Sequence, residues 1–417
     1  MSRKKVYLSW LWVALCSLAI FLIVPTARTI QSFVSRYFGR SLFGYSVIAL
    51  TVVVFATLVY VLFFRLKIRS PSNYIWLTAV AFLYIYYTHK LWRAPEEAVH
   101  FLEYGLLGYF LFQALSFSIK DKTIYLAAIL IGSLVGIFDE ILQWIVPGRL
   151  WDIRDVELNA FAVALFQVSI WKGINPKIIS QRINPRSVKR VSLLLGMNLV
   201  LLGLCLSNNP KVIAWYSRLF PALSPLQNEE PMDDFRYKHK DSEIGAFYSR
   251  LTIEELRDID SKNASAQAEI LNNAKDTNYE QFLRSFSSTL NPFLHEIRVH
   301  IYRRDKKFEE GQIAENAEVR KKALFISYKE NLILEKYFTQ TIRKTAYKWD
   351  EDRIRDLEGL IDKNFPYTSP VSKSLFGSFN GITLWSIIVA ILFVVALFNL
   401  LYSRSQKSQH HPIDNSR

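Results

Sequence analysis

The sequence predicts an all-α protein: a multi-pass helical membrane bundle of about eight transmembrane helices, with a helical extracytoplasmic domain inserted before the last span. Three observations lead to this fold class. Long apolar segments are almost free of charge, and the 417-residue chain is 51% hydrophobic and 21% charged, against about 25% charged residues in soluble proteins. Residues 208–379 are densely charged but balanced, with 27 basic and 27 acidic residues. The basic excess of the chain therefore lies beside the apolar segments, as it does in membrane proteins.

The overall composition excludes several other classes of protein. With 15 Gly, 14 Pro and 2 Cys, the chain is not collagen-like, low-complexity or a disulfide scaffold. A net charge of +14 can indicate nucleic-acid binding, but its position beside apolar segments favours a membrane, so we expect no nucleic-acid partner. Cys16 and Cys205 lie inside apolar runs and are interpreted as small core residues.

Eight apolar segments are expected to cross the membrane, because a bilayer core about 30 Å thick requires a helix of roughly 20 residues. They are residues 6–24, 45–64, 74–87, 100–119, 124–146, 156–171, 191–206 and 382–402. The third, sixth and seventh segments are short for a full crossing. Arg3, Lys4 and Lys5 precede the first segment, as in a signal peptide. No small-residue cleavage site follows it, which favours an uncleaved span.

The distribution of positive charge predicts the orientation, because cytoplasmic loops carry an excess of Lys and Arg. With the N-terminus inside, the cytoplasmic ends and loops hold 17 basic residues and the short outer loops hold seven. Both termini are therefore expected in the cytoplasm, and residues 208–379 outside it. In a bacterium, this is the periplasm or the cell exterior.

These spans define the expected domain organisation. Residues 1–207 form a membrane domain with seven spans, 208–240 a linker, 241–379 an extracytoplasmic helical domain, 380–402 the last span and 403–417 a cytoplasmic tail. Pro, Asn and charged residues mark the linker. Apolar residues at helical spacing predict helices over 242–259, 279–302, 315–347 and 353–361, with Pro292 marking a start or a kink.

Ten polar residues are expected to form a cluster at the outer membrane face. They are His100, Glu103, Tyr104, Asp139, Glu140, Gln143, Arg149, Asp152, Asp155 and Asn159. The first three are spaced i, i+3, i+4 near the start of one span, and the next three lie near the end of the following span. Asp152, Asp155 and Asn159 are spaced i, i+3, i+7 and open the span after that, so each group lies on one helix face.

Carboxylates in or beside an apolar span are costly, so they normally face the bundle interior and pair. Arg149 is the available cation, and His100 can act as a donor or a proton acceptor. Two interpretations stay open. The cluster is either a polar staple that holds three helix ends in register, or a pocket that binds or transforms a molecule at the outer leaflet.

The polar cluster resembles the VanZ-like membrane family over roughly residues 45–171. The resemblance is carried by His100-x3-Tyr104, Asp139-Glu140-x2-Gln143 and Pro147-Gly148-Arg149-x2-Asp152-x2-Asp155-x3-Asn159. The Gly that often follows the Asn in the family pattern is absent here. The resemblance implies a multi-pass protein of the bacterial cytoplasmic membrane and a link to glycopeptide antibiotic resistance, whereas no family is recognised for residues 208–379.

A weaker constellation lies in the inserted domain. His295 and His300 are spaced i, i+5, which does not fit a zinc-protease helix. Glu296 and His300 are spaced i, i+4, and Glu330 or Glu335 from the next helix would complete a metal site. The alternative is an ordinary helix face in which Glu296 pairs with a neighbouring Arg.

Three functions compete on this sequence. The first is a non-enzymatic envelope protein that binds an outer-leaflet lipid or cell-wall precursor, with the insert contacting a periplasmic protein or the wall. The second is an intramembrane enzyme for a lipid-linked substrate, with Asp139 or Glu140 as base, His100 as acid and Arg149 holding an anion. A transporter ranks last, because the cytoplasmic halves of the spans hold almost no ionisable groups. No cofactor is expected, since Gly-rich phosphate loops and paired Cys are absent from the sequence.

Overall fold

The chain forms two compact units in the computed structural model, which describes residues 3–147, 149–233, 236–274, 278–288, 290–361, 366–373 and 381–408. The first unit comprises Met1–Cys205 and Trp385–Arg417, and the second comprises Leu206–Leu384. Gly148 of the predicted Pro147-Gly148 turn, and residues 409–417 of the predicted tail, lie outside the described residues.

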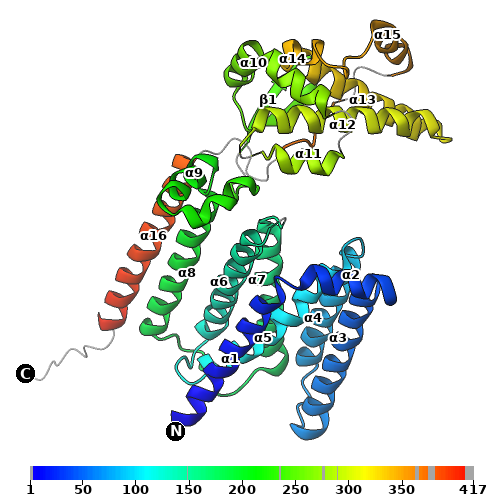
Figure 1. The fold of residues 1–417 in the computed structure, drawn as a ribbon. Helices are drawn as coiled ribbons and strands as arrows, with labels where there is room; N and C mark the ends of the chain where they lie inside the picture. Colours follow the sequence, from blue (N-terminus) through cyan, green and yellow to red (C-terminus); the bar gives the residue numbers. More distant parts are fainter. Residues whose placement is uncertain are drawn as a thin grey trace, which may run out of the picture. The chain divides into compact units, whose positions relative to one another are not determined.

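Helices make up the first unit (Figure 1). They are α1 (Arg3–Ile23), α2 (Ala27–Tyr37), α3 (Leu42–Tyr60) with η1 (Val61–Arg65), α4 (Pro71–Lys90), η2 (Pro95–Ala98), α5 (Val99–Leu115), α6 (Thr123–Ile145), α7 (Ile153–Val168) with η3 (Ser169–Ile174), α8 (Pro185–Leu206) and α16 (Gly381–Ser408). Five segments are long and apolar enough to span a bilayer: Arg3–Ile23, Leu42–Arg65, Thr123–Ile145, Pro185–Leu206 and Gly381–Ser405. The prediction of a helical membrane protein is therefore confirmed, and the count of eight spans stays a prediction.

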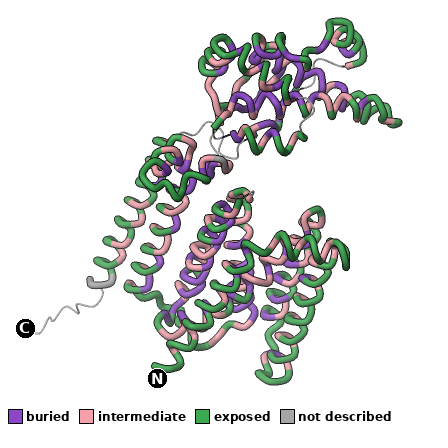
Figure 2. Tube along the Cα trace, viewed as in Figure 1, coloured by how far each residue is buried: buried purple, intermediate pink, exposed green. Residues whose placement is uncertain are grey.

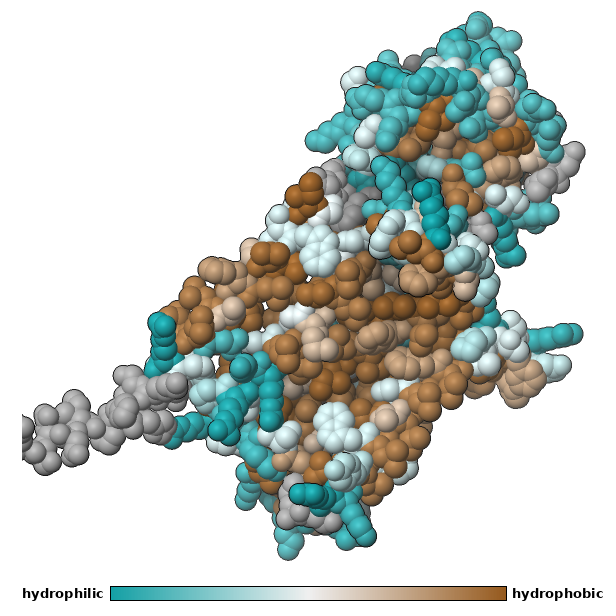
Figure 3. All heavy atoms as spheres, turned by 60° about the vertical axis from the view of Figure 1, so that its left-hand side comes forward, coloured by the Kyte–Doolittle hydropathy of each residue, from teal (hydrophilic) through white to brown (hydrophobic). Residues whose placement is uncertain are grey.

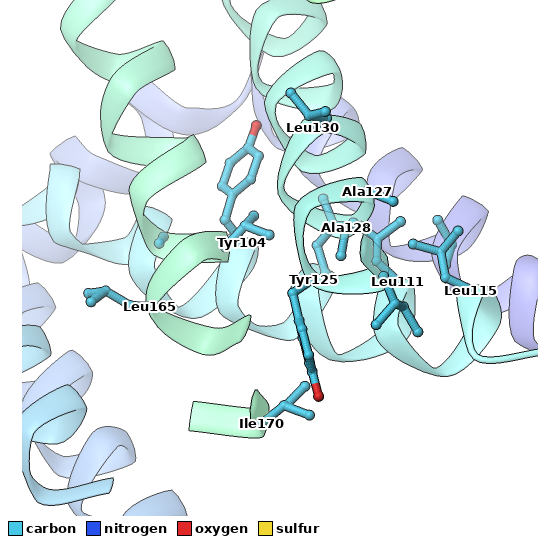
Figure 4. Packing of buried hydrophobic residues seen from close by; sticks show 14 of the residues in the cluster. Tyr104, Leu111, Leu115, Tyr125, Ala127, Ala128, Leu130, Leu165 and Ile170 are labelled. Atoms are coloured by element: carbon cyan, nitrogen blue, oxygen red, sulfur yellow. The ribbon is translucent and has the colours of Figure 1, made fainter. Parts of the chain in front are cut away.

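The core of the first unit lies between α5, α6 and α7, where buried residues concentrate (Figure 2). Apolar side chains of the three helices pack together there, among them Leu111, Ala128 and Leu165 (Figure 4). Small residues bring the helices close, since a Cβ added to Gly132 of α6 would lie 2.6 Å from a methyl carbon of Val163 on α7. Close backbone approach of this kind is a common basis of helix packing in membranes.

The outer surface of the first unit is largely apolar. Large hydrophobic side chains are exposed along α1, α3 and α16, including Leu8, Leu15, Leu22, Val53, Tyr60, Val389, Phe393 and Leu397. Figure 3 shows hydrophobic residues over much of this unit and a mostly hydrophilic surface on the second unit. An apolar exterior on long helices fits contact with lipid chains.

The second unit combines helices with one hairpin. Its elements are α9 (Pro210–Leu219), η4 (Pro221–Asn228), β1 (Tyr237–Asp241), β2 (Gly245–Ser249), α10 (Ile253–Asn273), α11 (Tyr279–Ser285), α12 (Pro292–Ile313), α13 (Ala317–Tyr337), α14 (Thr339–Arg343) and α15 (Glu351–Leu360). The strands are antiparallel, with Tyr237 opposite Ser249. Phe247 of the hairpin and Leu256, Ile297 and Leu334 of the helices meet in one core.

The hairpin departs from the sequence prediction, which placed a linker over 208–240 and a helix over 242–259. Tertiary contact overrides local helical spacing here, because Phe247 is fully buried and Ala246 exchanges backbone hydrogen bonds with Tyr367 and Ser369. Gly245 has φ +107°, and a Cβ there would lie 2.2 Å from the carbonyl oxygen of Tyr367, so only Gly fits. Met232 in the predicted linker is buried as well.

Acidification is expected to weaken the second unit through Asp241. Burial would raise the pKa of this carboxyl, but hydrogen bonds from Lys336, Tyr337 and the backbone of Glu243 and Ile244 lower it to about 2. The stability that Asp241 contributes is therefore fully present above its unfolded pKa of about 3.9, and is lost as the pH falls through about 2.

Thermal unfolding of the detergent-solubilised protein tests this dependence. The difference in unfolding temperature between wild type and Asp241→Asn should stay constant from pH 6 to about pH 4 and should then shrink toward pH 2. A difference that stays constant down to pH 2 would contradict the prediction.

Candidate functional site

The ten residues of the predicted polar cluster lie at one end of the first unit. His100, Glu103 and Tyr104 lie in the first turns of α5, and Asp139, Glu140 and Gln143 in the last turns of α6. After α6 the chain turns, with Arg149 N donating to Val146 O at 3.1 Å. Asp152 then begins α7 as its N-cap, since its side chain accepts from the backbone N of Arg154 at 2.9 Å. Capping and this turn therefore bring three helix ends together.

A cavity of about 500 Å³ opens at this end. Seven of the ten predicted residues line it: His100, Glu103, Asp139, Gln143, Arg149, Asp152 and Asp155. Tyr104, Glu140 and Asn159 are buried and do not line the cavity. The structure thus brings most of the cluster onto one open surface, and leaves three members behind it.

The two carboxylate oxygens of Asp139 have different surroundings. Its side chain is only 2% exposed, and its Oδ2 accepts a hydrogen bond from the Tyr104 hydroxyl at 3.2 Å. Its Oδ1 is buried and has no hydrogen-bond partner among the described residues. Asp139 therefore lines the cavity with a buried carboxylate oxygen that still lacks a hydrogen-bond donor.

A chain of hydrogen bonds joins Glu140 to the end of α1. Gln143 Nε2 donates to Glu140 Oε1 at 2.5 Å, and the Arg149 guanidinium donates to Gln143 Oε1 through Nη2. Arg149 Nη1 also donates to the carbonyl oxygen of Val24 at 2.9 Å. Arg149 is half-buried, and burial lowers the pKa of its guanidinium from the ordinary value. Glu140 and Gln143 therefore position Arg149 at the cavity wall.

His100 and Glu103 form the neighbouring part of the wall. His100 Nδ1 lies 3.4 Å from Glu103 Oε2, and each side chain is 19% exposed. The distance is within ion-pair range, but His100 Nδ1 makes no hydrogen bond to the described residues. His100 and Glu103 therefore place an imidazole and a carboxylate side by side in the cavity lining.

Asn159 lies between α6 and α7 and not in the cavity lining. It is fully buried on α7, where a Cβ added to Gly136 of α6 would lie 3.0 Å from the Asn159 Cβ. Its two amide atoms have no hydrogen-bond partner among the described residues. Asn159 therefore packs at the contact between α6 and α7, away from the cavity lining.

Comparison with known proteins identifies a family that part of the chain resembles. Residues 11–172 match the family model described as VanZ/LLP1. This region of the chain is VanZ-like. The match extends the resemblance from residue 45 to residue 11, so the VanZ-like region includes every residue that lines the cavity. The chain matches none of the curated proteins and none of the solved structures.

Sequence reasoning missed the wall that α2 and η2 contribute to the VanZ-like cavity. Arg28 and Gln31 of α2 and Glu96 and Glu97 of η2 line it. Gln31 Nε2 donates to Glu96 Oε1 at 2.7 Å, and Arg40 pairs with Glu96. Burial raises the pKa of Glu97, and the nearby negative charges of Asp155 and Glu96 raise it further. The spacing of Glu97 and His100, i, i+3, was a usable signal.

The remaining lining of the VanZ-like cavity is apolar. It comes mainly from the end of α1 and from α2, with Phe43, Val99 and Leu150 beside them. Ile20 of α1 and Val24, just after that helix, are buried, whereas Ile30 of α2 is 44% exposed. The cavity lining therefore combines aliphatic side chains with charged ones.

The structure does not support the metal site predicted in the inserted domain. His300 Nδ1 contacts Glu330 Oε2 at 2.6 Å, and Glu296 instead accepts from the Ser249 hydroxyl at 2.5 Å and from Arg250 N at 2.8 Å. Glu335 joins neither group. Throughout the described part of the chain, no three His, Cys, Asp or Glu side chains are grouped as metal ligands. Glu296 and His300 are held by separate polar networks.

Proposed function

We propose that the VanZ-like region binds the headgroup of an outer-leaflet lipid or lipid-linked cell-wall precursor. The observation that carries this proposal is the division of the cavity lining between aliphatic side chains, such as Ile20, Ile23 and Ile30, and charged side chains, such as Glu103, Asp139 and Arg149. An amphiphile has the same division between its chain and its headgroup. Pockets of this size commonly combine apolar walls with a few placed polar groups.

The orientation that we propose places the cavity at the outer leaflet. Basic residues are concentrated in the loops at the opposite ends of these helices, where Lys120, Lys122, Lys172 and Arg182 lie. The positive-inside rule assigns those loops to the cytoplasm. The same rule places residues 208–379 in the extracytoplasmic space, where they would contact a periplasmic protein or the wall.

Arg149 is the group that would hold an anionic headgroup. A guanidinium has five N–H donors, and two of those in Arg149 bond to Val24 O and Gln143 Oε1. Arg149 forms no ion pair with the described carboxylates within 4 Å. Its remaining donors and its charge therefore suit a phosphate oxygen at the cavity wall.

Replacing Arg149 with Gln is expected to weaken binding of a phospholipid-linked ligand by tenfold or more, because a charge-assisted hydrogen bond contributes about 1.5–3 kcal/mol. The measurement is binding of phosphatidylglycerol and of a lipid-linked wall precursor to the purified full chain. Arg93→Gln is the matched control, since Arg93 is exposed near the same end and does not line the cavity. Equal binding by the two variants would contradict the proposal.

An intramembrane enzyme is the second candidate, and one observation favours it. Asp139 and His100 line the same cavity, and Asp139 Oδ1 and His100 Nδ1 lack hydrogen-bond partners among the described residues. A base and an acid on one cavity can move protons during cleavage of a lipid-linked substrate. Glu140, the other base considered from the sequence, does not line the cavity. Identical turnover by wild type and a His100→Ala, Asp139→Asn double variant would reject this candidate.

The VanZ-like resemblance also leads us to propose a link to glycopeptide antibiotic resistance. Binding of a wall precursor at the outer leaflet would place the protein at the target of such antibiotics. Cells that express wild type, Arg149→Gln or Arg93→Gln at equal levels would be compared for glycopeptide susceptibility. Only Arg149→Gln should match cells without the protein, and equal protection by all three would contradict the link.

A further inference from the structure

The charges on the cavity wall are unequal. Six carboxylates line it, and they come from Glu96, Glu97, Glu103, Asp139, Asp152 and Asp155. The basic groups that line the same cavity are the guanidiniums of Arg28 and Arg149 and the imidazole of His100. An excess of carboxylates at the edge of a membrane is costly unless cations compensate it.

Two of the six carboxylates are compensated by residues beside the cavity. Glu96 pairs with Arg40. Asp152 accepts hydrogen bonds from Arg154, through Nε at 3.0 Å and Nη2 at 2.6 Å. Glu103 lies within ion-pair distance of His100. Glu97, Asp139 and Asp155 remain, and they exceed the two arginines that line the same space.

Asp139 gives this excess a direction. Only 2% of Asp139 is exposed, and the residue lines the cavity. Its Oδ1 has no hydrogen-bond partner among the described residues. Its other oxygen, Oδ2, accepts a hydrogen bond from the Tyr104 hydroxyl at 3.2 Å, so Oδ1 is the atom that still lacks a donor. A buried carboxylate oxygen in this state is matched by a ligand that brings a donor and a positive charge.

We infer that the cavity recognises a primary ammonium group, held by Asp139 with Glu103 beside it. This inference rests on the proposed function and specifies its ligand. An ammonium group is compact and has three N–H donors, so it can bond to Asp139 Oδ1 and a neighbouring carboxylate together. With a phosphate at Arg149, the ligand is zwitterionic in the cavity. The ammonium comes either from an aminolipid headgroup or from an amino-acid side chain of a lipid-linked peptide.

The experiment uses the full chain in phosphatidylglycerol nanodiscs and compares ligands that differ only at the amine. Phosphatidylethanolamine and N-acetyl-phosphatidylethanolamine form one pair. A soluble lysine-containing wall peptide and its Nε-acetyl form are the second pair. We expect binding of the amine form to be tenfold or more tighter in one pair, which identifies the source of the ammonium.

Three variants connect the preference to the cavity. Asp139→Asn should reduce the preference for the amine to less than twofold, and Asp139→Glu should retain it. Glu157→Gln is the matched control, because Glu157 is exposed on α7 and does not line the cavity, and it should behave as wild type. If Asp139→Asn fails to fold, the comparison of amine and acetylated ligands on wild type decides alone.

The outcomes separate this inference from the proposed function. Equal binding of amine and acetylated ligands, with loss of both in Arg149→Gln, would overturn the ammonium and leave the headgroup site standing. An amine preference that Asp139→Asn leaves intact would overturn the assignment to this cavity. No binding of either pair, or of the phospholipid and wall-precursor probes, would overturn both proposals.

Discussion

Replacing Glu330 with Ala is expected to destabilise the second unit by about 3–5 kcal/mol, the usual cost of removing one partner from a buried charge network. Glu330 is fully buried on α13 and accepts four contacts. They come from His300 Nδ1 at 2.6 Å, Arg303 Nε at 2.9 Å, the Tyr367 hydroxyl at 2.6 Å and the Ser369 hydroxyl at 2.8 Å. Burial would raise the pKa of Glu330, but His300 and these hydrogen bonds hold it below the ordinary value. The carboxylate therefore stays charged, and its loss leaves several donors unsatisfied.

Thermal unfolding of the full chain measures this effect, with protease cleavage within residues 237–349 as the signal of unfolding. Glu309→Ala is the matched control, since Glu309 is an exposed Glu on α12. Glu330→Gln should lie between Glu330→Ala and wild type, because the amide oxygen can still accept hydrogen bonds. The prediction is wrong if Glu330→Ala and Glu309→Ala unfold at the same temperature.

Replacing Gly132 with Leu should force α6 and α7 apart and remove headgroup binding. An added Cβ at Gly132 already lies 2.6 Å from Val163 Cγ2, and overpacking of this kind costs about 1–3 kcal/mol. Asp139 on α6 and Asp155 on α7 form parts of one cavity wall, so their separation would change. We therefore expect a lower unfolding temperature, together with at least tenfold weaker binding of the ligand that wild type prefers.

A compensating change tests whether space is the cause. In Gly132→Ala with Val163→Ala, the smaller partner makes room for the new methyl group, so this double variant should regain both stability and binding. Gly359→Ala is the control, because nothing lies within 4 Å of a Cβ at that position. Full binding by Gly132→Leu would show that the contact between α6 and α7 does not determine the cavity.

Much of the first unit could be predicted because its signals are local. Apolar length predicted α1, α3, α6 and α16. Helical spacing and the turn at Arg149 predicted that the polar residues of α5, α6 and α7 would meet, and seven of the ten line one cavity. The resemblance to the VanZ-like family is confirmed by the match over residues 11–172.

The remainder depends on contacts between segments far apart in the chain. The sequence analysis missed α2 because this amphipathic helix is short. Its signal was the helical spacing of Ile30, Phe33, Val34 and Tyr37. The sequence brought Glu330 to His300 only as one of two possible metal ligands, whereas in the structure the two side chains contact each other directly and join α12 to α13. The hairpin at 237–249 forms against Tyr367 and Ser369, more than 100 residues later, so no local pattern could show its partner.

The exposure of α2 has a consequence for the entry of molecules into the cavity. None of the α2 residues is buried, yet Ala27, Arg28, Ile30 and Gln31 form part of the cavity wall. Gln31 of α2 donates to Glu96, and Arg40 just beyond the helix pairs with the same carboxylate. An outward movement of α2 would therefore widen the cavity, while the close contacts of Gly132 and Gly136 between α6 and α7 stay undisturbed.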